Sequence, residues 1–250
     1  MTFTCDLTID ELVLVEEVGF EPLDLVMGST YFHIGWQPTL GAGWTQNFEL
    51  VDITAMMVNA RLTAMARLFE QLAACKADGV VGVRLEIERE GNHAEFTAIG
   101  TAVRRKDNDH ARWRKPNGQP FSCDLSGADF WALVRGGFRP VGLAYGVCVY
   151  HVAHQSLGQW FSTVNQNVEM PAFTQGLYDA RELAMQRMQY EAFQMGGTGG
   201  LVGVNVTEGS HGWGSHVIEF AAVGTSVLPI GDPAHETHEA PGVVLGAQDR

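Results

Sequence analysis

Hydrophobic residues follow two different periods along the chain. Residues 53–75 carry apolar side chains at every third or fourth position, which is typical of an amphipathic helix. Gly79 follows this segment, and we expect it to form the C-terminal cap of the helix. The apolar segments 12–18 and 23–34 instead predict strands, separated by a Gly-Phe-Glu-Pro turn at 19–22. Segments 80–88 and 95–103 predict two further strands, joined as a hairpin through Gly91-Asn92.

This pattern of strands and one helix occurs twice. Residues 5–37 align with 123–155 without a gap and are identical at ten of 33 positions. The helical segment ARLTAMAR at 60–67 matches ARELAMQR at 180–187, and EFTAIGTAV at 95–103 matches EFAAVGTSV at 219–227. The sequence therefore predicts two tandem α+β units, each a two-layer arrangement of a small antiparallel sheet and one long helix.

The repeat also predicts where the units begin and end. We expect the first unit over residues 1–105 and the second over 121–230. Residues 106–120 are polar with a net positive charge, which is typical of a linker. Residues 231–250 lack hydrophobic periodicity and predict a flexible tail.

Composition narrows the class of partner. The formal net charge of −13 makes a nucleic-acid backbone an unfavourable partner, because there is no basic surplus to displace its counterions. No apolar run approaches the length of a membrane-spanning helix, and the first residues lack the pattern of a secretory signal. None of the four cysteines lies in a C-x-x-C pair, so we expect reduced thiols and a cytoplasmic location.

Two short motifs carry a resemblance to a known family. The segment ADGVVGV at 77–83, together with GTAV at 100–103, resembles the YbjQ-like family, which is labelled as heavy-metal-binding. The second copy departs from the first motif, with TGGL at 198–201. The resemblance covers both copies, and it implies dodecin-like units that associate into a closed ring, often a pentamer. Single-unit members of the family lack the duplication.

Four residues are candidate ligands for a divalent metal ion. Cys148, His151 and His154 are spaced three apart in the second copy, and His33 occupies the position equivalent to His151. On a straight strand, Cys148 and His154 would share a face but lie about 20 Å apart, while His151 would face the opposite way. Ordinary packed or interface residues are therefore the alternative interpretation, and His33 and His151 could also line a ligand pocket.

Nothing in the sequence predicts catalysis. There is no nucleophile-elbow, P-loop or dinucleotide motif, and no basic residue adjoins Cys5 or Cys123 to activate the thiol. We therefore expect a non-enzymatic protein. One hypothesis is an oligomeric ring that binds a metal ion or small ligand. The other is a structural or adaptor protein whose ring presents a surface to a protein partner.

Overall fold

The computed structural model describes residues 4–33, 46–90, 93–107, 109–115, 117–153, 171–210 and 216–231. The helices are α1 (Ile9–Glu17), α2 (Val51–Ala74), α3 (His110–Trp113), α4 (Gly127–Arg135) and α6 (Pro171–Gln194). The strands are β1 (Phe20–His33), β2 (Phe48–Glu49), β3 (Gly79–Glu90), β4 (His93–Arg105), β5 (Phe121–Ser122), β6 (Phe138–His151), β7 (Leu201–Ser210) and β8 (Val217–Pro229). The predicted α+β class is confirmed.

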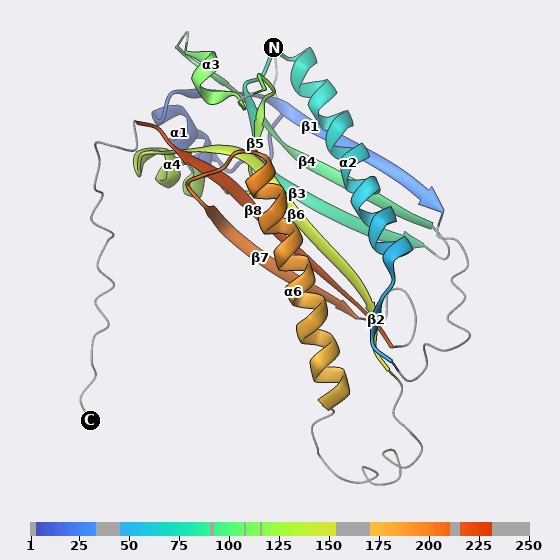
Figure 1. The fold of residues 1–250 in the computed structure, drawn as a ribbon. Coiled ribbons are helices and arrows are strands. Elements are labelled where there is room, and N and C mark those ends of the chain that lie inside the picture. The colour runs from blue at the N-terminus through green and yellow to red at the C-terminus, as the bar shows by residue number, and fades with distance from the viewer. Residues whose placement is uncertain are drawn as a thin grey trace, which may run out of the picture.

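Two four-stranded sheets carry the internal repeat. Their strand orders are β1-β4-β3-β5 and β2-β6-β8-β7, and the three long strands of each sheet are antiparallel. Helix α2 packs on the first sheet and α6 on the second, so each unit has one long helix against its sheet (Figure 1). The predicted hairpin is present, since Glu90 of β3 lies opposite His93 of β4; the turn residues 91 and 92 fall outside the described part.

Each unit contributes a two-residue strand that is hydrogen-bonded into the sheet of the other unit. Strand β5 lies at the start of the second copy, yet it pairs in parallel with β3 of the first sheet. Strand β2 lies in the first copy and pairs with β6 of the second sheet. The segment predicted as a linker contains α3, whose Trp113 is buried against Phe20. The unit boundaries stay a prediction. The two units share strand pairing and buried side chains in addition to the connecting segment.

The first predicted strand, 12–18, is wrong, because this segment lies within and just after helix α1. Thr8 and Glu11 form a capping box, in which the Thr8 hydroxyl accepts from the Glu11 N–H and the Glu11 carboxylate bonds back to Thr8. This satisfies N–H groups that the first helical turn leaves free. Ser126 caps α4 by accepting from the N–H of Asp129. Figure 1 shows α1 and α4 packed side by side.

The long helices lie directly on their sheets at two equivalent glycines. A Cβ atom on Gly28 of β1 would lie 2.0 Å from the carbonyl oxygen of Ala64, and one on Gly146 of β6 would lie 1.9 Å from that of Ala184. Any larger residue would therefore separate helix from strand. At the glycines that interrupt the predicted strands, strand and helix backbones thus come too close to leave room for a side chain.

Gly79 does not cap α2 as predicted. The helix ends at Ala74, and Lys76 adopts the left-handed conformation instead, with φ of 57°. Gly79 already belongs to β3, where a Cβ atom would lie 2.3 Å from the ring of Phe121. This glycine is required for the close approach of β5.

Helix α2 packs against both sheets. Its Ile53 and Met57 form one buried cluster with Tyr145, Val147 and Val149 of the second sheet. Further along the helix, its apolar residues pack on the first sheet in a second cluster. The core thus continues from one unit into the other through α2. No helix in the described part of the chain is long and apolar enough to span a membrane.

Candidate assembly interface

Beyond its short pairing with β2, the outer edge of β6 is covered by side chains from the helix of the first unit. Arg61 of α2 donates through Nη2 to the carbonyl oxygen of Leu143 at 2.7 Å. Thr54 of α2 accepts from the N–H of Val149 at 3.0 Å. These bonds satisfy backbone groups that an edge strand would otherwise expose.

The second unit covers two of the backbone groups that lie between these. The N–H of Tyr145 donates to Oε2 of Glu191 at 2.7 Å, and the carbonyl oxygen of Val147 accepts from Nη1 of Arg187 at 2.8 Å. Four outward-facing backbone groups of β6, on Leu143, Tyr145, Val147 and Val149, are therefore bonded by side chains of the long helices. Two of the side chains come from α6 of the same unit and two from α2 of the other.

The free edge of β1 has only the half of this arrangement that the unit's own helix supplies. The N–H of Met27 donates to Oε1 of Gln71 at 2.9 Å, and Arg67 donates to the carbonyl oxygen of Ser29. Gln71 and Arg67 belong to α2 of the same unit and are equivalent to Glu191 and Arg187 in the repeat. The helix of each unit thus bonds its own strand in the same way.

The other half of the arrangement has no counterpart within the part of the chain that the structure describes. The groups equivalent to those of Leu143 and Val149 are the carbonyl of Leu25 and the N–H of Tyr31, and no side chain of the described residues bonds either group. The residues equivalent to Arg61 and Thr54 are Arg181 and Thr174 of α6. Both residue types are retained, although neither residue has a strand to cover.

Burial of the helices shows the same asymmetry. Ile53 and Met57 of α2 are 1% and 0% exposed because the second sheet covers them. Their equivalents on α6, Phe173 and Leu177, are only half-buried, and the adjacent Tyr178 is 61% exposed. We call Phe173, Leu177, Tyr178 and Arg181 the free helix face.

The strand that would receive such a helix is exposed as well. Tyr31 and Met27 of β1 are 63% and 47% exposed, whereas the equivalent Val149 and Tyr145 of β6 are 0% and 6% exposed. We call Met27, Ser29 and Tyr31 the free strand face. Among the described residues, six of the ten exposed large apolar or aromatic side chains have equivalents at the contact between the units: Ile9, Val13, Met27, Tyr31, Tyr178 and Val204.

Charged groups hold α2 and β2 at the contact between the units. Arg61 is 5% exposed, pairs with Glu191 and lies 5.6 Å from the ring centre of Tyr145. Glu49 of β2 accepts two bonds from Arg187, at 2.7 and 2.8 Å. Burial alone would raise the pKa of Glu49, but the bonds from Arg187 and Thr54 and the charge of Arg187 lower it below its ordinary value.

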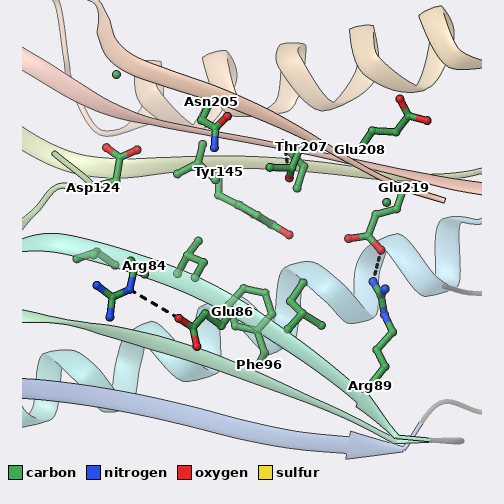
Figure 2. A pocket seen from close by; sticks show the side chains of 17 residues that line it. Arg84, Glu86, Arg89, Phe96, Asp124, Tyr145, Asn205, Thr207, Glu208 and Glu219 are labelled. Carbon is green, nitrogen blue, oxygen red and sulfur yellow. Dashed lines mark hydrogen bonds and ion pairs between the residues drawn. The ribbon is translucent and has the colours of Figure 1, made fainter. Parts of the chain in front are cut away.

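A cleft of about 620 Å³ lies between the two sheets, beside α2 (Figure 2). Phe96, Leu85 and Ile87 line it from the first sheet, and Asn205 and Thr207 line it from β7. An ion pair between Arg89 and Glu219 joins the two sheets at one end. The cleft thus combines an apolar interior with polar groups at its margins, as ligand pockets often do.

Tyr145 extends into the space between the sheets (Figure 2). Its hydroxyl oxygen is buried without a hydrogen-bond partner among the described residues. Burial raises the pKa of Tyr145, and the nearby charge of Glu219 acts in the same direction, so the phenol is neutral at physiological pH. The side chain therefore adds a neutral hydroxyl without a hydrogen-bond partner to the wall of the cleft.

The structure separates the predicted metal ligands. Cys148 is buried among residues that pack on α6, while His151, three residues later, stacks on Phe48 with ring centres 5.0 Å apart. His33 lies at the end of β1, in the other sheet, and His154 falls outside the described residues. Within the described ranges no three metal-binding side chains gather in one place. A metal site at these residues stays a prediction.

One histidine pair was not anticipated from the sequence. His33 Nδ1 lies 3.4 Å from Nε2 of His93, directly opposite on β4, and His93 stacks on Tyr31. The β1–β4 register creates this pair, and the spacing in sequence gave no signal of it. Two imidazoles supply half of the four ligands that zinc usually takes in proteins.

The buried cysteines lack the environment of a nucleophile. Burial, together with the negative charge of Asp124, raises the pKa of Cys123. Burial also raises the pKa of Cys148 to about 12, with the charge of Glu49 contributing. Both thiols are therefore protonated at neutral pH, where a thiolate would be needed for attack.

Comparison with known proteins agrees with the duplicated fold. A family model described as "Putative heavy-metal-binding" matches residues 17–106, which is most of the first unit. The UPF0145 protein MmarC6_1828 of Methanococcus maripaludis is 36% identical over 97 residues, which cover 37% of this chain and 87% of that protein. That relative therefore has the length of a single unit.

A second relative matches both units. The encapsulin nanocompartment protein Rv1762c of Mycobacterium tuberculosis is 46% identical over 233 residues, covering 92% of this chain and 87% of that protein. The fold and the comparisons together define a tandem pair of α+β units. The chain belongs to the YbjQ-like family, in a duplicated form.

Proposed function

We propose that this protein is a non-enzymatic assembly protein, whose chains associate head to tail through the same contact that joins its two units. The observation that carries the proposal is the pair of surfaces left open by the repeat. The free helix face has the residues of a contact but no strand, and the free strand face has the strand but no helix. Placing the helix face of one chain on the strand face of the next would complete both.

The bonds expected between chains follow from the contact within the chain. Arg181 would donate to the carbonyl oxygen of Leu25 in the next chain, as Arg61 does to Leu143. Thr174 would accept from the N–H of Tyr31, as Thr54 does from Val149. Unlike surfaces meet in such a contact, so repetition gives either a closed ring or a filament. We propose a ring, and a pentamer of chains on the basis of the family resemblance.

The relative of similar length suggests a setting for such an assembly. It is named as an encapsulin nanocompartment protein. We propose that this chain likewise associates with a protein compartment in the cytoplasm, where the assembled ring presents its surface to a protein partner. Co-expression with an encapsulin shell protein, followed by sedimentation, tests this part; the ring should sediment with the shell, and separate sedimentation would contradict it.

Assembly itself is tested by native mass spectrometry of three tyrosine-to-glutamate variants. Tyr178→Glu places a charge on the free helix face, and Tyr31→Glu places one on the free strand face. Tyr190→Glu is the matched control, because Tyr190 is 66% exposed on the same helix. Its equivalent, Glu70, stays exposed although α2 packs between the units.

The parent and Tyr190→Glu should both have the mass of a multimer of the 27.3 kDa chain. Tyr178→Glu and Tyr31→Glu should each give mainly single chains, because a buried unpaired carboxylate at the contact is strongly unfavourable. A parent that is monomeric at micromolar concentration would refute the proposal. So would equal masses for all three variants.

A second candidate function is the binding of a small ligand in the inter-sheet cleft. The unpartnered hydroxyl of Tyr145 and the apolar walls favour it. The same mass spectra of freshly purified protein would reveal a retained ligand as a constant added mass. We expect that mass to disappear in Tyr145→Phe while the number of chains is unchanged. A parent without added mass would count against this candidate.

A further inference from the structure

Basic residues are concentrated at one end of the molecule. Eight of the 16 lysine and arginine residues line two adjoining hollows of about 630 and 540 Å³, which share Arg114. The chain as a whole carries a net charge of −13. The positive charge at this end of the molecule therefore contrasts with the acidic composition of the whole chain. The eight are Lys76, Arg104, Arg105, Lys106, Arg112, Arg114, Lys115 and Arg139.

In the first hollow, carboxylates accompany the cations. Glu21 accepts from Nε of Arg104 at 2.8 Å, and Asp107 accepts from Nε of Arg105 at 2.9 Å. Asp78 is 1% exposed and bonds Arg114. These side chains form internal ion pairs, and they account for most of the charge in this hollow.

Among the described residues, no carboxylate lines the second hollow, whose lining consists of residues 111, 112, 114, 115, 139 and 229–231. Arg112 donates to the carbonyl oxygen of Ile230, and Arg139 donates to that of Arg114 at 3.3 Å. In the described part of the chain, the nearest carboxylate to Arg112 is that of the exposed Asp109, 3.9 Å away. Since a guanidinium has five N–H donors, Arg112 and Arg139 can each form further bonds.

The surroundings of Arg139 disfavour the charged form of its guanidinium group. Arg139 is half-buried, and this burial lowers its pKa, with the neighbouring charge of Arg112 acting in the same direction. Desolvation and repulsion both oppose the charged form. An anion between the two guanidinium groups would relieve both effects.

The repeat shows that Arg139 is not needed to complete an internal ion pair. Its equivalent in the first unit is Glu21, which lies opposite Arg104 in the β1–β4 register. In the second unit Arg139 lies opposite Leu228. Thus the second unit has Arg139 in place of the acidic Glu21 and Leu228 in place of the basic Arg104. The guanidinium of Arg139 has no carboxylate opposite it and is available to a ligand.

We propose that the second hollow is an anion site that binds a small molecule carrying linked phosphate groups. Arg112 and Arg139 donate to the phosphate oxygens, since planar guanidinium groups bind phosphate through paired N–H donors. Arg114 is fixed by Asp78 and extends the positive surface toward the first hollow. The volume suits a compact ligand, and the acidic remainder of the chain disfavours a long polyanion.

Isothermal titration calorimetry with tripolyphosphate tests the site in phosphate-free buffer. Arg112→Gln and Arg139→Gln should each weaken binding at least about tenfold, because each removes charge-assisted hydrogen bonds. Arg84→Gln is the control, since it removes an equal charge from an exposed arginine outside both hollows, and it should bind like the parent. Circular dichroism spectra and melting curves confirm that all variants are folded.

Three results would overturn the proposal. The parent could fail to bind tripolyphosphate at millimolar concentration. The three variants could weaken binding equally, which would indicate diffuse electrostatic attraction. A single-stranded oligonucleotide could bind more tightly than tripolyphosphate with the same dependence on Arg112 and Arg139, which would indicate a nucleic-acid surface instead.

Discussion

Replacing Gly146 by alanine tests the contact between β6 and α6. The new Cβ atom would lie 1.9 Å from the carbonyl oxygen of Ala184 and 2.5 Å from the amide nitrogen of Met188, whereas ordinary contact begins at 3.4 Å. Both obstructing atoms are backbone, so no rotamer change can relieve the clash. Helix and strand must separate by about 1.5 Å, which is the difference between 3.4 and 1.9 Å.

The magnitude follows from two opposing effects. Overpacking costs about 1–3 kcal/mol, and loss of glycine flexibility in the unfolded chain returns about 0.4–1 kcal/mol. Because both obstructing atoms are backbone, we expect a cost near the upper end and a net loss of about 2 kcal/mol in the free energy of unfolding. For a chain of this size, the melting temperature should fall by about 4–8 °C.

Gly142→Ala on the same strand is the matched control for this prediction. The nearest atom to its new Cβ would be the sulfur of Met195 at 2.6 Å, at the end of a flexible side chain that can move. Its stability should change by less than about 1 kcal/mol. The measurement is denaturant unfolding of parent and both variants at one protein concentration. Equal midpoints for Gly146→Ala and the parent would refute the packing argument.

Three further predictions concern single groups. Thr8→Ala should lower the free energy of unfolding by about 1 kcal/mol, measured by denaturant unfolding, because it removes the cap of α1. Glu49→Gln should lower the free energy of unfolding by about 1 kcal/mol at pH 7, because it removes the carboxylate that Arg187 binds. The pKa of Glu49 is lower in the folded than in the unfolded protein. The stabilisation by Glu49 is therefore complete above the unfolded pKa of about 4.3 and is lost as the pH falls through the folded pKa. A difference from the parent that does not shrink as the pH is lowered below about 4.3 would contradict that assignment. Cys123 should react with a thiol reagent only after unfolding, whereas the half-buried Cys5 should react in the native protein, and mass spectrometry of labelled peptides would distinguish them.

The repeat and the long helices could be predicted from the sequence because their signals are local. The spacing of Ile53, Met57 and Ala60 predicts α2, and its exposed and buried faces agree with that spacing. Helix α1 was missed because valine and leucine dominate residues 12–15, although the capping box at Thr8 and Glu11 was a readable signal.

The contact between the units could not be predicted in this way. The two-residue strands β2 and β5 are too short to have a pattern, and each pairs with a strand of the other copy. Arg61 and Arg181 are identical positions in the sequence, yet one is buried and the other is exposed. That difference depends on which sheet lies beside each helix, and this follows only from the three-dimensional arrangement.

The anion site was also invisible in the sequence. Residues 106–120 were recognised as positively charged but interpreted as a linker. Their folding beside Pro229 and Arg139 brings together residues more than a hundred positions apart. The charge was therefore evident from the sequence, and its partners were not.

Disulfide cross-linking tests most directly whether the contact within the chain also occurs between chains. Thr54 and Val149 are joined by a 3.0 Å hydrogen bond, so their equivalents Thr174 and Tyr31 should lie within disulfide range across two chains. Chains carrying Thr174→Cys are mixed with chains carrying Tyr31→Cys, both with Cys5 and Cys75 changed to serine, and are then oxidised. We predict a product of two chains that disappears on reduction, and none when Tyr190→Cys replaces Thr174→Cys. Absence of that product, or equal yields from both mixtures, would contradict head-to-tail assembly.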